Sequence, residues 1–120
     1  MGLRVNPSLK KYVDDLFAAL HPAKIKTGSY TGNGIDNRNI DIGVNLLEKS
    51  FKWVVIKANS TIAGCHKPSS LAGDAAQFFV NSANSDDIIQ SFTATGFQVG
   101  SDSYANYNGT VFQWVAIWEE

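Results

Sequence analysis

Few side chains of this sequence are of the types that do catalysis or bind metals. Cys65 is the only cysteine and is followed directly by His66, while the other histidine, His21, lies far away in the chain. A catalytic thiol needs a base beside it, and consecutive side chains of a strand point to opposite faces. A structural zinc site needs four ligands, which these residues do not supply. We therefore predict no catalytic residue, no metal site and no cofactor.

Two further patterns suggest chemistry but have structural explanations. Asp86 and Asp87 are adjacent carboxylates, yet they precede two isoleucines and fit a cap or a turn at the entry to an element. Gly32, Gly34 and Gly43 have no strand-loop-helix unit around them, which a phosphate-binding loop requires. These glycines are predicted to form turns. We therefore expect a protein that is not an enzyme.

The composition favours a small β-rich protein with no polyanionic or membrane partner. The 120 residues suffice for one domain, and a formal net charge of −1 does not fit a nucleic-acid binder. No apolar run approaches the roughly 18 residues that would indicate membrane insertion. Asn, Ser, Thr and Gly make up 37 of the 120 residues, and these types favour tight turns between short strands. The composition therefore argues against an all-helical fold.

The start of the chain carries the pattern of an amphipathic helix. Asn6 can cap it, Pro7 suits its first position, and Pro22 ends it. Six apolar residues recur at spacings of three and four, which places them on one face. They are Leu9, Tyr12, Val13, Leu16, Phe17 and Leu20. This face either covers a sheet of its own domain or packs on a neighbouring subunit, as an arm would.

The chain after Pro22 has strand-like patterns. Strands are predicted at residues 26–31, 38–44, 52–58, 77–81, 92–100 and 111–118, with a helical turn or strand entry at 85–90. The 52–58 strand is predicted to be central, and 111–118 to be central and buried on both faces. Gly96 indicates a bulge or bend within its strand, and Asn108-Gly109 suits a type I′ hairpin turn. We expect a mainly β, two-sheet antiparallel β-sandwich, jelly-roll-like, over residues 24–120, with residues 1–23 as an N-terminal helical arm of the same single domain.

Aromatic residues beside the turns are candidates for binding a sugar. Tyr30, Tyr104, Tyr107 and Trp118 lie in or beside segments rich in Asn and Gly. A sugar ring needs a flat apolar surface together with hydrogen-bonding groups at its rim. The alternative is that these four rings cap the ends of the sandwich core.

Several turn and core motifs, taken together, resemble a known module. They are Thr31-Gly32-Asn33-Gly34, Ile42-Gly43, Trp53-Val54-Val55-Ile56-Lys57, Ile89-Gln90-Ser91, Gly96-Phe97-Gln98-Val99-Gly100, Asn106-Tyr107-Asn108-Gly109 and Phe112-Gln113-Trp114-Val115-Ala116. Across residues 27 to 118 the chain resembles a β-sandwich module common in virion proteins of tailed bacteriophages. It departs from the usual pattern by lacking a proline ahead of Trp53 and by having Phe112 where tyrosine is usual.

This resemblance implies a virion structural protein located on the capsid surface or the tail and made in the host cytoplasm. For a chain of this size we expect a non-enzymatic capsid decoration protein, also called a cement protein, that binds neighbouring capsid subunits. The alternative is a tail- or fibre-associated module that binds a receptor or a carbohydrate such as host surface polysaccharide. The expected partners are the major capsid protein or tail components. A homo-oligomer, dimer or trimer, is expected as well, because the apolar helix face must be buried.

Overall fold

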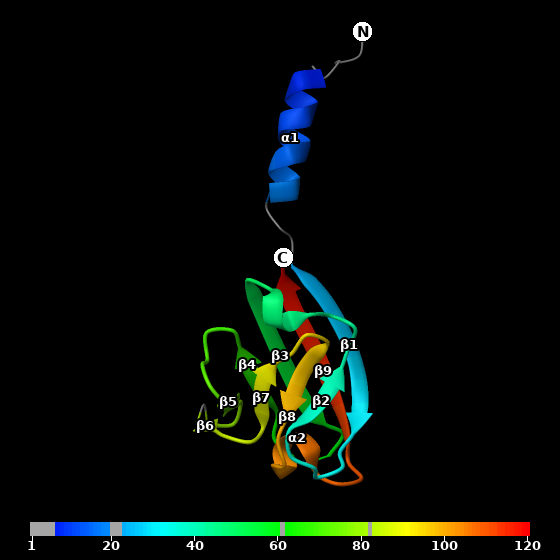
Figure 1. Ribbon diagram of the computed structural model, residues 1–120, viewed down its shortest axis with the longest axis vertical. Coiled ribbons are helices and arrows are strands. Elements are labelled where there is room, and N and C mark those ends of the chain that lie inside the picture. The colour runs from blue at the N-terminus through cyan, green and yellow to red at the C-terminus, as the bar shows by residue number, and fades with distance from the viewer. Residues whose placement is uncertain (1–6, 20–22, 61, 82) are drawn as a thin grey trace.

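The computed structural model describes residues 7–19, 23–60, 62–81 and 83–120, and it is mainly β. The chain begins with a helix, α1 (Pro7–Ala19), and continues into the strands of a two-sheet body (Figure 1). The strands are β1 (Lys24–Thr31), β2 (Arg38–Asp41), β3 (Phe51–Ala58), β4 (Cys65–Pro68), β5 (Ala76–Phe78), β6 (Asn84–Ser85), β7 (Ile89–Phe92), β8 (Gly96–Val99) and β9 (Val111–Glu119). A 3-10 turn, η1 (Leu46–Glu48), precedes β3, and a one-turn helix, α2 (Ser103–Asn106), precedes β9.

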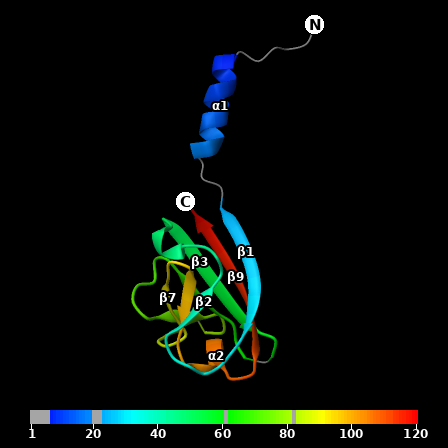
Figure 2. The same ribbon diagram turned by 45° about the vertical axis from the view of Figure 1, so that its right-hand side comes forward.

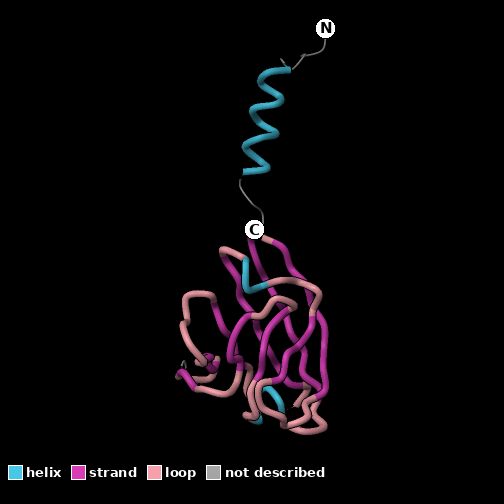
Figure 3. The backbone as a smooth tube through the Cα atoms, in the orientation of Figure 1, coloured by secondary structure: helices cyan, strands magenta, loops and turns pink. Residues whose placement is uncertain are grey.

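The strands form two antiparallel sheets. The larger sheet has the order β1-β9-β3-β4-β5-β6, and the smaller has the order β2-β8-β7. Strands β9 and β3 are central, since β9 pairs with β1 and β3 along its length while β3 pairs with β9 and β4. In Figure 3, strands and the loops that connect them make up most of this body.

The hydrophobic core draws its side chains from both sheets. Val54 and Ile56 of β3 and Phe112 of β9 are fully buried, as is Phe97 of the smaller sheet. The Phe97 ring meets the Trp114 ring edge to face, with 6.1 Å between centroids. The alternation of buried and exposed positions along β9 follows from the two-residue period of a strand. The larger sheet therefore buries one face against the smaller sheet.

The prediction that the last strand is buried on both faces is wrong. On the second face of β9, Val111 and Gln113 are exposed, and Val115 and Ile117 are only half-buried. The apolar content of this face suggested burial, but the smaller sheet lies on the opposite face and no described residue forms a layer here. We call this second face of the larger sheet its outer face.

The prediction of one strand over 92–100 is also wrong. The chain turns back after β7, and Gly96 is the first residue of β8, so the expected bend is a hairpin turn. Thr93 stabilises this turn, because its Oγ1 accepts a hydrogen bond of 2.9 Å from the Gly96 amide. A Cβ atom at Gly96 would collide with the backbone carbonyl of Ile40 in the neighbouring strand. Close approach of two backbones thus explains the glycine.

Asn108-Gly109 does form a turn, but not the predicted hairpin between neighbouring strands. Gly109 has φ +84°, a conformation that favours glycine. The turn joins α2 to β9, whose partners are β1 and β3. Helix α2 was not predicted, because its four residues are too few to show helical periodicity.

Helix α1 lies outside the two-sheet body in both ribbon views (Figure 2). On its predicted apolar face, the exposed fractions are 54% for Leu9, 62% for Tyr12, 38% for Val13 and 48% for Leu16. The side chain of Phe17 and all of Leu20 lie outside the described residues. On the opposite face, Lys10 pairs with Asp14 and Lys11 with Asp15, each at 2.7 Å. Within the described residues, this helix does not cover a sheet of its own chain.

The described helices include none that combines the length and the apolar character of a membrane span.

Candidate functional site

Cys65 and His66 lie side by side in β4 and point to opposite faces. Cys65 is fully buried in the core, and this burial raises the pKa of its thiol to about 12. His66 lies on the outer face, where its Nδ1 accepts a hydrogen bond of 2.9 Å from Trp53 Nε1. Its Nε2 is 3.1 Å from Gln77 Oε1. The pair therefore lacks the geometry of a nucleophile and its base.

Within the ranges that the structure describes, no three or more His, Cys, Asp or Glu side chains gather closely enough to hold a metal ion. His21 lies outside the described residues.

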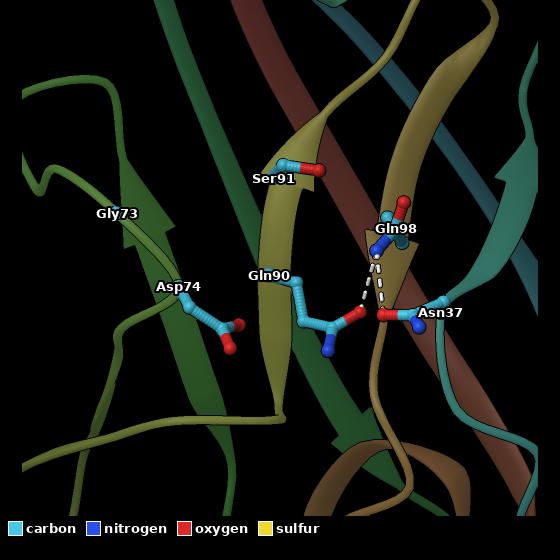
Figure 4. A pocket seen from close by; sticks show the side chains of 6 residues that line it. All are labelled: Asn37, Gly73, Asp74, Gln90, Ser91 and Gln98. Carbon is cyan, nitrogen blue, oxygen red and sulfur yellow. Dashed lines mark hydrogen bonds between the residues drawn. The ribbon is translucent and has the colours of Figure 1, made fainter.

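An open hollow lined by polar residues lies over the smaller sheet (Figure 4). Its volume is about 360 Å³, and it is lined by Asn37, Gly73, Asp74, Gln90, Ser91 and Gln98. Gln90 and Gln98 come from the paired strands β7 and β8. Asn37 and Asp74 come from loops on either side of them, as the close-up shows. Three separate segments of the chain therefore build this hollow.

Hydrogen bonds fix the amide groups of the hollow in place. Gln98 Nε2 donates to Gln90 Oε1 at 2.7 Å and to Asn37 Oδ1 at 3.2 Å. Gln90 is buried, and its Nε2 donates to Asp36 Oδ1 at 3.0 Å and to Asp87 Oδ1 at 3.2 Å. Each bond holds a rotatable side chain in one orientation. The hollow therefore presents a preorganised set of polar atoms.

One carboxylate, that of Asp74, lies at the rim of this hollow. The pKa of Asp74 is raised above its usual value. Desolvation is the largest cause, and the negative charge of Asp87 is the second. Asp87 and Asn37 both have positive φ angles, of 62° and 55°. Asp and Asn tolerate this conformation better than most residues do. Asp87 thus does occupy a turn, as predicted, and it also anchors the buried amide of Gln90.

Two of the four aromatic residues proposed for sugar binding belong to the core. Tyr30 stacks on Phe112 with 5.4 Å between ring centroids, and its hydroxyl donates to the Ala105 carbonyl at 2.6 Å. Desolvation by burial raises the pKa of Tyr30. Trp118 is buried near the far end of β9. Neither ring offers a face to a sugar.

Tyr104 and Tyr107 are the other two. Tyr104 lies in α2, Tyr107 directly follows it, and both are exposed. The Tyr104 ring contacts the ring of Phe78, with centroids 4.5 Å apart. The structure therefore does not bring the four predicted residues together. The amide side chains of Asn37, Gln90 and Gln98 were missed as site residues, because each looks like an ordinary polar position within its own segment.

Two features of the described structure are thus candidates for function, the exposed apolar face of α1 and the polar hollow over the smaller sheet. No protein-family model, curated protein or solved structure matches this chain.

Proposed function

We propose that this chain is a non-enzymatic structural protein of a bacteriophage virion, a capsid decoration protein that attaches to neighbouring capsid subunits. The observation that supports attachment is the exposed stripe of α1, with Leu9, Tyr12, Val13 and Leu16 all open to solvent. A helix with one apolar face reaches a stable state in water by burying that face. Because α1 stands outside the body, another protein subunit is the partner that this surface fits.

The proposed fold of the body is a jelly-roll-like β-sandwich. In support, the buried side chains of both sheets form one core, with Phe97 of β8 packed against Trp114 of β9. The virion setting is proposed from the sequence resemblance over residues 27 to 118. Two glycines of the motifs that carry this resemblance allow a close approach of two backbones. A Cβ atom at Gly32 would collide with the Tyr107 carbonyl, and one at Gly96 would collide with the Ile40 carbonyl. The low charge, 18% of residues, also suits a surface that packs on protein, where few charges need be desolvated.

Replacing Leu16 by serine is expected to weaken attachment to capsids about tenfold or more, since burying one leucine contributes ~1.5–3 kcal/mol and ~1.4 kcal/mol is tenfold in affinity. The measurement is co-sedimentation of the purified chain with particles that lack it. Lys11→Ser is the matched control, because it places the same residue on the polar face of α1. Immunogold labelling of virions should find the chain on the capsid. Its confinement to the tail tip, or equal binding of both variants, would contradict the proposal.

The second candidate function is carbohydrate binding by a tail- or fibre-associated module, and the polar hollow favours it. Fixed amides and a rim carboxylate are the groups that bind sugar hydroxyls. For this function Gln98→Ala is expected to weaken binding of host surface polysaccharide at least tenfold, measured by calorimetric titration. Gln113→Ala, an exposed glutamine of β9, is the control. No detectable heat with the unmodified chain would exclude this function.

A further inference from the structure

Two carboxylates orient the amide groups of the polar hollow over the smaller sheet. An ionised carboxylate only accepts hydrogen bonds, so the buried Gln90 turns its NH₂ group to Asp36 and Asp87. The Oε1 of Gln90 therefore faces the opposite way, toward Gln98. Gln98 in turn presents its Nε2 to this oxygen, at 2.7 Å, and to Asn37 Oδ1, at 3.2 Å. The two carboxylates thus set the orientation of both glutamines.

This orientation decides which atoms the hollow offers to a ligand. An amide NH₂ group has two protons, and the hydrogen bonds above use both protons of Gln90 and both of Gln98. Acceptors that line the hollow are the carboxylate of Asp74 and the Oε1 of Gln98, which points away from Asn37 in Figure 4. Asn37 Nδ2 and the hydroxyl of Ser91 can donate. A fitting ligand therefore has a strong donor together with hydroxyl groups, which both donate and accept.

Negative charge gathers beside the hollow. Desolvation is the largest cause of the raised pKa of Asp74, and the negative charges of Asp87 and Asp86 add to it. The carboxylate of Asp87 is also one of the two that hold Gln90. Like charges this close disfavour one another's ionised form, and a bound cation removes that cost. The electrostatics of the hollow therefore favour a cationic ligand and oppose an anionic one.

Two basic side chains of neighbouring segments bind backbone carbonyls of the chain itself. Lys67 is only 2% exposed, and its Nζ donates to the carbonyls of Gly73 and Ala75 at 2.8 Å and 2.6 Å. Arg38 Nη1 donates to the Thr31 carbonyl at 2.7 Å. The buried ammonium of Lys67 offsets at most one of the three carboxylates named above. A ligand is therefore left to supply the cationic group at the surface of the hollow.

We infer that the hollow binds a sugar that carries a protonated amine, and that it rejects acidic sugars. The inference rests on the second candidate function, carbohydrate binding, and names the class of sugar. Asp74 lies on one side of Gln90, and Gln98 and Asn37 lie on the other (Figure 4), so the amine pairs with Asp74 while ring hydroxyls meet the two amides. The volume of about 360 Å³ lies near the lower end of the ~300–1,000 Å³ of small-molecule sites, which suits a sugar unit. A lysine side chain has the ammonium group but none of the hydroxyls.

The test compares two sugars that differ only in their amines. The full chain is titrated calorimetrically with the glucosamine trimer, at a pH at which its amines are protonated, and with the fully N-acetylated form of that trimer. The free-amine trimer is expected to bind at least tenfold more tightly. Asp74→Asn removes the charge but keeps the shape of the side chain, and it is expected to abolish this preference. Asp15→Asn is the matched control, because it makes the same change on α1, and it should keep the preference.

Other outcomes separate this inference from the function on which it rests. Equal binding of the two trimers would overturn the inference and leave carbohydrate binding standing. Three results would also overturn it: tighter binding of an oligogalacturonate, equal binding of Nα-acetyl-lysine amide, or displacement of the amine by an equal concentration of Ca²⁺. No binding of either trimer would overturn it too, and titration with host surface polysaccharide then decides the second candidate function by itself. A chain that binds the free-amine trimer through Asp74 but no host polysaccharide would support the inference and contradict that function.

Discussion

Replacing Phe97 by alanine is expected to lower the free energy of unfolding by about 3–5 kcal/mol, the usual cost of removing a buried phenylalanine ring. Phe97 is fully buried in β8, the central strand of the smaller sheet. Its ring contacts two rings of the larger sheet edge to face, those of Tyr30 at 6.4 Å and Trp114 at 6.1 Å. The substitution therefore leaves a cavity where the two sheets meet.

Urea denaturation followed by far-ultraviolet circular dichroism measures this loss without depending on the fluorescence of Trp114. Val80→Ala is the control, because Val80 is the most exposed of the large apolar residues described and its truncation should change stability by less than about 0.5 kcal/mol. If Phe97→Ala cost less than about 1.5 kcal/mol, the two sheets would not share a core that stabilises the fold. The β-sandwich proposed for the body would then lose its main support.

The sequence predicted the elements whose patterns are local. The helix face with Leu9 and Leu16 and the strands now assigned as β1, β3 and β9 were found from spacing alone, to within a few residues. What spacing does not show is whether a face is covered. Val115 and Ile117 looked as buried as Trp114 because all three are large and apolar. Burial depends on the layer that lies opposite, and the smaller sheet lies on only one side.

The candidate sites were even harder to predict from local sequence patterns than the buried faces of the strands. Tyr30 and Tyr107 are both tyrosines beside turns rich in Asn and Gly, yet one is stacked in the core and the other is exposed. Gln90 and Gln98 meet only because β7 and β8 fold into a hairpin with a register shift between Ile89 and Ser91. No local pattern encodes the approach of Asn37 and Asp74 from distant loops. The apolar row on the outer face of the larger sheet is likewise a property of strand pairing, since Ile25 and Trp53 are brought together only by β9 between them.

Replacing Asn106 by alanine is expected to lower the free energy of unfolding by about 3 kcal/mol, because a buried polar group left without its partner costs ~1–3 kcal/mol. Asn106 is fully buried at the end of α2. Its Nδ2 donates to the carbonyls of Ile35 at 2.8 Å and Gly100 at 3.0 Å. Its Oδ1 accepts from the Asn33 amide at 2.9 Å and from Arg38 Nη1 at 3.2 Å. One side chain therefore ties the loop between β1 and β2 to the segment before β9.

Asn108→Ala is the matched control, because Asn108 belongs to the same Asn106-Tyr107-Asn108-Gly109 motif but is exposed. This substitution should lower the free energy of unfolding by at most about 0.5 kcal/mol. Thermal and urea unfolding of both variants, with capsid binding measured at a temperature where each is folded, separates stability from attachment. We expect Asn106→Ala to lose stability and keep its capsid binding, since α1, the proposed attachment element, lies elsewhere in the structure. Equal stability of the two variants would show that the hydrogen bonds of Asn106 are dispensable. A loss of capsid binding by folded Asn106→Ala would instead place the attachment surface at this end of the body. Asn106 only holds two loops together, and α1 lies beyond the opposite end of β1, so the substitution should not affect attachment through α1.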